Sequence, residues 1–254
     1  MKEVLQDILE HDAVRSGTTA LPLRHPDFPD LPVAIDRAEG AYLQRVIEHV
    51  RPRTSIEIGC AYGVSALYIC EALSELPHPA RHILIDPFQS TQWRGLGVQH
   101  LREAGFADIV DIHEDYSEFV LPALLRNGIE IEFAFVDGRH TFDQVMVEFW
   151  YLNRMLAPGG VIVFDDADRR SVNRVIRHAL TYPAYRVHGT ATPQPSRRSM
   201  AGRLRRTVAG MWPVRNLVRA DVRDRDWDLG IMGSCVAIQK VEADQRSSGW
   251  DRVF

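Results

Sequence analysis

Residues 55–65 of this chain read SIEIGCAYGVS, a strand-like run that passes through two glycines into a second apolar segment. Ser55–Gly59 has the pattern of a short strand, and Val64–Leu73 has apolar residues at helical spacing. Gly59 and Gly63 lie between them and allow a tight turn that brings the backbone close to a ligand. A strand, a glycine turn and a helix in this order predict a ligand crevice at the carboxyl edge of a parallel sheet.

The same alternation of strand and helix continues along the chain. Strands are expected at residues 82–85, 109–112, 131–136, 161–164, 184–189 and 233–241, and helices at residues 98–104, 119–125, 141–155 and 172–180. Strands separated by helices of this length form βαβ units, and their near-continuous apolar character fits a sheet covered on both faces. The sequence therefore predicts an α/β fold with a doubly wound, Rossmann-like sheet.

Composition excludes several classes of protein. The chain has 254 residues, 45% hydrophobic residues and a formal net charge of −4, so it carries no overall basic footprint and no nucleic-acid partner is expected. No apolar run reaches the roughly 18 residues that a membrane-spanning helix needs. The first residues show no secretory signal, and three widely spaced cysteines form neither a disulfide framework nor a zinc motif. A cytoplasmic location is the expectation.

The two regions outside the alternating pattern have a different character. Residues 1–38, with four prolines between Leu21 and Pro32, are expected to form an N-terminal helical cap or lid. Residues 190–228 form a basic insertion before the last strand, with seven arginines between Arg197 and Arg219 and no acid over the same stretch. This insertion could contact an anionic substrate or a membrane surface, or it could be a solvated helix pair that packs on the core.

An acidic residue follows the second expected strand. Asp86 comes 23 residues after Gly63, where a carboxylate can accept hydrogen bonds from ribose hydroxyls. The glycine spacing is Gly-x-x-x-Gly and not the Gly-x-Gly-x-x-Gly of dinucleotide sites, so the pair indicates a nucleoside without a diphosphate. The alternative is a packing turn without a ligand, with Asp86 as a cap.

Three further acids follow the fourth and fifth expected strands. Asp137 ends one strand, and Asp165 and Asp166 end the next, so all three should emerge on the same edge of the sheet. Converging carboxylates repel unless they are protonated or share a cation, and oxygen ligands suit Mg²⁺, Mn²⁺ or Ca²⁺. His140 starts the next helix and could act there as a general base. Alternatively, these acids cap a helix and pair with Arg139 or Arg169.

Taken together, residues Glu39 to Leu180 resemble the class I S-adenosylmethionine-dependent methyltransferases, and more narrowly the cation-dependent O-methyltransferases that act on catechols and on natural-product sugars. The resemblance implies a seven-stranded sheet whose last strand is antiparallel, within a methyltransferase domain of residues 39–254. It also implies cofactor contacts from six residues: Glu57, Gly59, Gly63, Ser65, Asp86 and Asp115. In this pattern Gly59 holds the methionine part, Ser65 bonds its carboxylate and Asp115 contacts adenine.

The metal positions of the catechol type also have counterparts. In that group a second acid and a neighbouring Asp or Asn follow the first metal Asp by 28 and 29 residues, as Asp165 and Asp166 follow Asp137. The resemblance implies a divalent cation, Mg²⁺, at these three residues. His140 stands where that group has its catalytic lysine. The expected activity is O-methylation of a small molecule, or of a sugar in a natural product or glycolipid, and the family makes a homodimer plausible.

Three other functions are compatible with parts of the pattern. An NAD-binding Rossmann oxidoreductase lacks support because the third glycine is missing and because hydride transfer has no use for Asp165 and Asp166. A non-methylating relative, similar to the cephalosporin-hydroxylase-like proteins, would share the core and the acidic site. A scaffold protein whose core no longer turns over is disfavoured because the carboxylates and the base are all present.

Overall fold

The computed structural model describes residues 34–191, 226–247 and 250. Most of the expected N-terminal cap and residues 192–225 of the basic insertion lie outside the described residues. The strands are β1 (Thr54–Ile58), β2 (Arg81–Ile85), β3 (Val110–His113), β4 (Ile131–Val136), β5 (Leu156–Phe164), β6 (Tyr185–Thr190) and β7 (Val236–Lys240). The helices are α2 (Arg37–Val50), α3 (Val64–Ser74), α4 (Leu96–Glu103), α5 (Ser117–Arg126), α6 (Phe142–Met155), α7 (Arg170–Ala179) and the short α10 (Asp226–Leu229).

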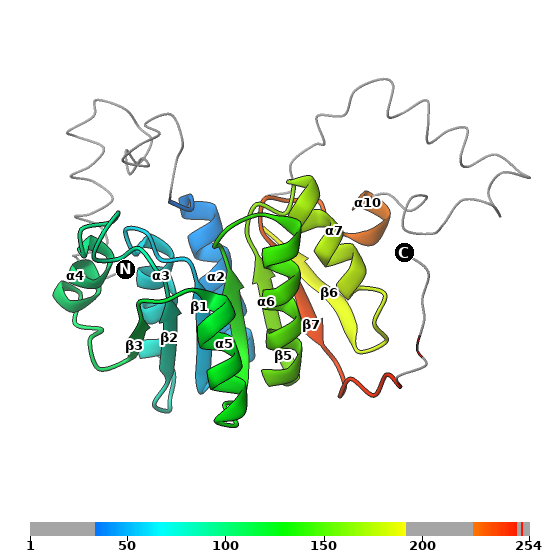
Figure 1. Ribbon diagram of the computed structural model, residues 1–254, viewed down its shortest axis with the longest axis horizontal. Coiled ribbons are helices and arrows are strands. Elements are labelled where there is room, and N and C mark those ends of the chain that lie inside the picture. The colour runs from blue at the N-terminus through cyan, green and yellow to red at the C-terminus, as the bar shows by residue number, and fades with distance from the viewer. Residues whose placement is uncertain (1–33, 192–225, 248–249, 251–254) are drawn as a thin grey trace, which may run out of the picture.

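The seven strands form one sheet in the order β3-β2-β1-β4-β5-β7-β6 (Figure 1). Strands β1 to β5 pair in parallel, whereas β7 runs antiparallel to both β5 and β6. This confirms the predicted doubly wound sheet and its antiparallel last strand. Because β1 and β4 lie side by side at the reversal of strand order, the loops that follow them meet at the carboxyl edge, where ligands bind in such sheets.

Helices cover both faces of the sheet, and β4 shows how the sequence produces the three layers. Phe133 and Phe135 point into the core shared with α2 and α3, while Ala134 and Val136 point into the core shared with α5, α6 and α7. Side chains alternate along a strand, so a strand buried on both faces needs apolar residues at every position. The uninterrupted run Phe133–Val136 meets that need.

Helix α2 begins before the expected domain boundary. Asp36 caps it, since its side chain accepts from the N–H of Glu39 while the Glu39 side chain accepts from the N–H of Asp36. Ile35 is already buried in the core. The expected boundary at residue 39 therefore falls inside this helix. No helix in the described part of the chain is both long and apolar enough to span a membrane.

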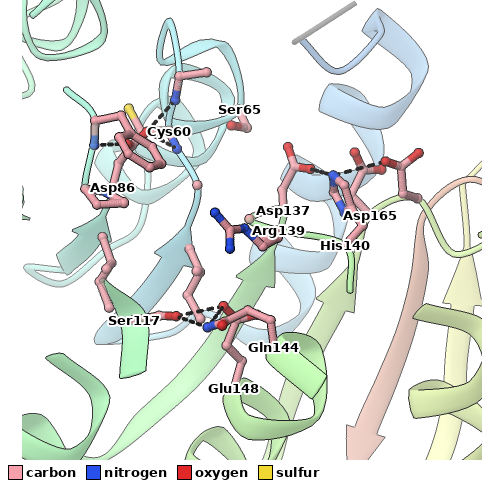
Figure 2. A pocket seen from close by; sticks show the side chains of 18 of the residues that line it. Cys60, Ser65, Asp86, Ser117, Asp137, Arg139, His140, Gln144, Glu148 and Asp165 are labelled. Carbon is pink, nitrogen blue, oxygen red and sulfur yellow. Dashed lines mark hydrogen bonds and ion pairs between the residues drawn. The ribbon is translucent and has the colours of Figure 1, made fainter. Parts of the chain in front are cut away.

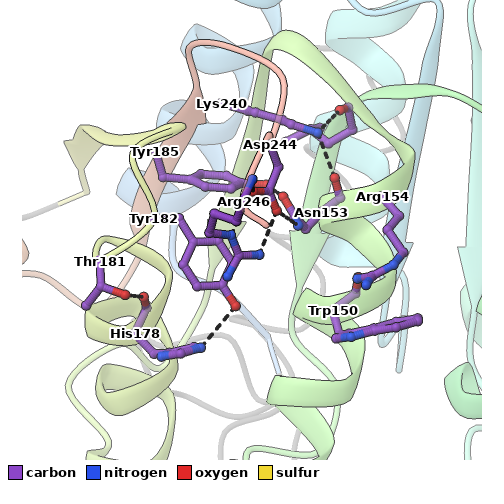
Figure 3. A network of polar contacts seen from close by, with 11 residues as sticks. Trp150, Asn153, Arg154, His178, Thr181, Tyr182, Tyr185, Lys240, Asp244 and Arg246 are labelled. Carbon is purple, nitrogen blue, oxygen red and sulfur yellow. Dashed lines mark hydrogen bonds and ion pairs between the residues drawn. The ribbon is translucent and has the colours of Figure 1, made fainter. Parts of the chain in front are cut away.

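The segment after β7 folds back over α6 and α7 (Figure 3). Asp244 accepts a 2.8 Å hydrogen bond from Asn153 of α6 and two more, of 2.7 and 2.6 Å, from the Arg246 guanidinium. That guanidinium also lies 3.1 Å from the ring centroid of Tyr182, and Trp250 packs on the same ring. These contacts hold the end of the described chain on α6 and α7, and none of the residues lines the large cavity described next.

Candidate functional site

A cavity of about 690 Å³ opens at the carboxyl edge of the sheet. The segments that follow β1, β2, β4 and β5 line it, together with the first turn of α5 (Figure 2). Its turn end is formed by Gly59, Cys60, Asp86 and Ser117, and its acid end by Asp137, His140, Asp165 and Asp166. The fold thus brings both predicted groups of site residues to one cavity.

The two glycines of the turn are required by packing. Gly59 has φ +94°, and a Cβ built there would lie 2.1 Å from the backbone oxygen of Asp137. Gly63 has φ +82° and caps α3, and a Cβ there would lie 3.0 Å from the backbone oxygen of Gly97. Gly59 lines the cavity, whereas Gly63 shapes the turn from behind. The contact between Gly59 and Asp137 joins the turn directly to the acid end.

Asp86 is buried and organises the turn end. Its Oδ2 accepts from the N–H groups of Cys60 (3.0 Å) and Ala61 (2.8 Å), and its Oδ1 accepts from the N–H of Phe88 (2.8 Å). Gln89 donates to the same Oδ2 and to the carbonyl of Ala61, a role that the sequence analysis missed. Asp86 therefore holds the loop after β1 in place while facing the cavity as predicted.

Glu57 and Ser65 belong to a buried chain of hydrogen bonds. The Ser65 hydroxyl donates to Glu57 Oε1, and His82 Nε2 lies 2.9 Å from Glu57 Oε2. The hydroxyl proton of Ser65 is thus committed to Glu57, and not available for a ligand carboxylate as the resemblance implied. Ser65 still lines the cavity, and the N–H groups of the first turn of α3 have no side-chain cap. Uncapped N–H groups at a helix start attract anions.

Asp115, like Glu57 and Gly63, is a predicted cofactor residue that does not line the cavity. Its side chain is exposed, and its Oδ1 accepts from the N–H of Tyr116 at 2.7 Å. The next three residues, Tyr116, Ser117 and Glu118, line the wall instead. The residues that line the wall begin one position after Asp115, because α5 begins at Ser117 and its first turn faces the cavity.

At the acid end, Asp137 and Asp165 are in direct contact. Burial raises the pKa of Asp137 well above its ordinary value, and the neighbouring Asp165 raises it further, with a hydrogen bond between the two carboxyl groups. Burial also raises the pKa of Asp165, which accepts a 2.9 Å hydrogen bond from the Cys235 thiol. Two carboxyl groups this close share a proton unless a cation neutralises them.

Asp166 is oriented by two basic side chains. It lies in the left-handed region with φ +50°, and its Oδ2 is 2.7 Å from Arg169 Nε and 3.1 Å from His140 Nε2. The pairing with Arg169 is the alternative that the sequence analysis had left open for this acid. Burial lowers the pKa of His140, so the imidazole is neutral at pH 7 in spite of the nearby acids.

A second group of possible metal ligands adjoins the acid end. Ligand atoms of Glu39, Asp165 and Cys235 all lie within 4.8 Å of one another. Of the three predicted metal ligands only Asp165 belongs to this group. Glu39 comes from α2 and Cys235 directly precedes β7, so neither follows a parallel strand, and the sequence pattern had no means of finding them.

The sequence analysis also missed a buried acid near the turn end. Glu148 of α6 lines the cavity wall and accepts hydrogen bonds from Ser117 Oγ (2.8 Å) and Gln144 Nε2 (3.3 Å). One signal was present in the sequence. Glu148 shares a helix face with the buried residues Val145, Phe149 and Leu152, where an acid is unexpected.

Comparisons with known proteins show which families and proteins the chain is similar to. A family model described as a methyltransferase domain matches residues 56–167. Tapetum-specific methyltransferase 1 of Arabidopsis thaliana is 28% identical over 158 residues, which are 62% of this chain and 64% of that protein. A putative caffeoyl-CoA O-methyltransferase of the same plant is 26% identical with the same coverage. The chain thus spans less than two thirds of the length of these curated relatives.

Solved structures show the same fold. The O-methyltransferase TomG from Streptomyces achromogenes, in complex with SAM, has a TM-score of 0.58 and 23% identity, covering 74% of this chain and 82% of that one. An O-methyltransferase from Bacillus cereus in complex with SAH has a TM-score of 0.59 and 16% identity, covering 74% and 83%. Residues 56–167, less than half of the chain, therefore match a model of a methyltransferase domain, and the fold is the one seen in these two O-methyltransferases, in agreement with the sequence resemblance.

Proposed function

We propose that this chain transfers the methyl group of S-adenosylmethionine to a hydroxyl of a small-molecule acceptor, with a divalent cation, Mg²⁺, at Asp137, Asp165 and Asp166. One observation carries the proposal. A single cavity joins a glycine turn ordered by Asp86 to a cluster of acids beside a neutral histidine. The matching family model favours this function over the oxidoreductase alternative.

The turn end has the features that the cofactor requires. Asp86 Oδ2 already accepts three hydrogen bonds, whereas Oδ1 accepts one, from Phe88, and its second lone pair can accept a ribose hydroxyl. The uncapped N–H groups at the start of α3 suit the carboxylate of the methionine part. Gly59 lines the cavity beside this turn and packs against the Asp137 backbone. Ser117 and Glu118 replace Asp115 as the residues nearest the purine.

The acid end fits a hard divalent cation. Asp137 and Asp165 lie close together and have raised pKa values, and a bound cation would reduce the repulsion between their ionised forms. Carboxylate oxygens are the ligands that Mg²⁺ prefers, and Glu39 beside Asp165 supplies a further one. When bound, the cation would act as a Lewis acid that lowers the pKa of the acceptor hydroxyl.

In this proposal His140 takes the proton that the acceptor loses. Its Nε2 faces Asp166, so the neutral ring donates from Nε2 and carries its lone pair on Nδ1. Nδ1 is therefore the atom that would receive the hydroxyl proton as the oxygen bonds to the methyl carbon and the carbon–sulfur bond breaks. Asp166, which is itself paired with Arg169, holds the ring in this orientation. A partner of this kind fixes which ring nitrogen carries the proton.

The acceptor class follows from the same geometry. A cation held on one side by acids binds best to two neighbouring oxygens, as in a catechol or a vicinal sugar diol. The names of the O-methyltransferase relatives agree with a small-molecule acceptor. Contact of the arginines between Arg197 and Arg219 with an anionic acceptor or a membrane surface stays a prediction, as do dimer formation and the absence of a nucleic-acid partner.

The test is formation of S-adenosylhomocysteine from S-adenosylmethionine with a panel of catechols and vicinal diols. We expect turnover with at least one acceptor in Mg²⁺, its loss in excess EDTA and its recovery when Mg²⁺ is restored. Full turnover in excess EDTA would contradict the cation role. Tight binding of S-adenosylmethionine without methyl transfer to any diol would favour the non-methylating alternative.

A further inference from the structure

Glu148 is a buried acid in the cavity wall that the proposed reaction leaves without a task. Its side chain is 1% exposed and lies on the inner face of α6. Figure 2 shows Glu148, Ser117 and Gln144 together at one side of the cavity, with His140 and Asp165 at the other. Glu148 is therefore separate from the acid end.

Two hydrogen bonds orient this carboxyl group, and a third joins the two donors to each other. Ser117 Oγ and Gln144 Nε2 both donate to Oε1, and the same Gln144 nitrogen lies 2.9 Å from Ser117 Oγ. The other oxygen, Oε2, is buried and has no hydrogen-bond partner among the residues that the structure describes. A buried polar atom without a partner is costly, so such an atom in a cavity wall indicates a missing ligand group.

The surroundings of Glu148 favour its neutral form. Burial raises its pKa to about 7, and the negative charge of Glu118 on α5 acts in the same direction. The hydrogen bonds from Ser117 and Gln144 oppose this only in part. Gly138 and Ile58, which approach from β4 and β1, bring no charge. A neutral carboxyl whose Oε1 already accepts two hydrogen bonds carries its proton on Oε2, where it becomes a donor.

We propose that Glu148 donates a hydrogen bond from Oε2 to a ring nitrogen of the cofactor's purine and thereby determines specificity for it. The purine ring nitrogens are acceptors, and the apolar side chains of Ile58, Ile85 and Phe88 line the same part of the cavity and suit a flat ring. The inference rests on the proposed function, because it assumes that S-adenosylmethionine occupies this cavity.

Calorimetric titration of S-adenosylhomocysteine and of adenosine, between pH 5.5 and pH 8, tests this role. Adenosine lacks the amino-acid part, so its binding reports on the purine and ribose contacts alone. The variants are Glu148→Gln, which keeps a donor at this position, and Glu148→Leu, which removes it. Glu103→Gln on α4 is the matched control, because that glutamate is exposed and does not line the cavity.

For the wild type we expect both ligands to bind more weakly as the pH rises through 7, because ionised Glu148 no longer donates. Glu148→Gln should bind with unchanged affinity across this range, and Glu148→Leu should bind about tenfold more weakly at pH 6, as for one lost buried hydrogen bond. Glu103→Gln should follow the wild type. Glu118→Gln should lower the pKa of Glu148, since it removes the neighbouring negative charge, and should therefore weaken binding at pH 7.5 and move the loss of affinity to lower pH.

Two results would overturn the inference. One is wild-type affinity in Glu148→Leu, and the other is a pH dependence that persists in Glu148→Gln. If Glu148→Leu does not fold, as judged by its thermal melting curve, the pH profile of Glu148→Gln decides alone. If the wild type binds neither adenosine nor S-adenosylhomocysteine at any pH, the proposed function fails as well, and the two failures are thereby distinguished.

Discussion

The two ends of the cavity differ in the partners of their aspartate side chains. At the turn end, Asp86 accepts from three backbone N–H groups and from Gln89, and the loop after β1 is fixed without any ligand. At the acid end, Asp137 and Asp165 contact each other with raised pKa values. Asp86 is thus satisfied by the protein alone, whereas the charges of Asp137 and Asp165 must be offset by a shared proton or by a cation.

The largest effect is expected at the acid end, on turnover. Replacing His140 with Ala removes the proposed proton acceptor, so turnover should fall by roughly 10²–10⁴-fold, the usual range for a general base. The affinity for S-adenosylhomocysteine should stay within about twofold of wild type, because the turn end is untouched. Steady-state assays and calorimetry measure the two quantities. Retention of full turnover would show that another group or solvent takes the proton.

The link between the two ends can be broken at Gly59. Gly59→Ala forces a Cβ toward the Asp137 backbone oxygen at positive φ, so it should destabilise the protein by about 2–4 kcal/mol and weaken cofactor binding. Gly159→Ala is the matched control, because Gly159 has nearly the same φ (+92°) and open space around its Cβ position. It should cost only about 1 kcal/mol. Equal losses in chemical denaturation would refute the steric argument.

The order of the turn end depends on the charge of Asp86. Asp86→Asn replaces one acceptor oxygen with an amide donor, which cannot serve all the N–H groups that Asp86 now bonds. We expect S-adenosylhomocysteine to bind roughly tenfold to hundredfold more weakly, as for loss of a charged hydrogen-bond acceptor. Asp108→Asn, at an exposed site outside the cavity, should bind normally. Normal binding by Asp86→Asn would remove Asp86 from the cofactor site.

The smallest effect should appear in the stability of the cation-free acid end. The folded-state pKa of Asp137 is raised above 3.8, so its contribution to stability is lost as the pH rises through that folded value. In EDTA at pH 8, Asp137→Asn should therefore have a higher melting temperature than wild type, by ~2–4 °C for each kcal/mol of added stability. The difference in melting temperature should shrink as the pH falls toward 4.

The same melting curves recorded in Mg²⁺ sharpen the comparison. Mg²⁺ should raise the melting temperature of the wild type and leave Asp137→Asn nearly unchanged, because that variant lacks one of the proposed ligands. An equal response of both proteins would place the cation elsewhere. The group of Glu39, Asp165 and Cys235 would then be the next candidate.

Much of the fold could be predicted because the signal is local. The run Ile131–Val136 is apolar almost throughout and lies in the middle of the sheet, and its predicted bounds match β4. Strand β5 was expected from Val161, yet it begins at Leu156. A shift in register between Ile131 and Phe133 of β4 accommodates the extra residues, and such an irregularity has no signature in one strand alone.

The candidate site was predictable only where its residues follow parallel strands. Asp86, Asp137 and Asp165 each follow such a strand, and the topology alone brings them to the same cavity. The commitment of the Ser65 proton to Glu57, the place of Glu39 beside Asp165 and the burial of Glu148 depend on three-dimensional packing between distant segments. A single sequence contains no spacing rule for such contacts.

The measurement that tests the account most directly is calorimetric titration of S-adenosylhomocysteine into metal-free protein, repeated with Mg²⁺. Because the turn end is preformed, we predict micromolar binding under both conditions, with Mg²⁺ required only for turnover. Absence of binding under both conditions would contradict the methyl-transfer proposal and leave the acid end as a site in need of another chemistry. Binding that appears only with Mg²⁺ would contradict the claim that the turn end forms independently of the acid end.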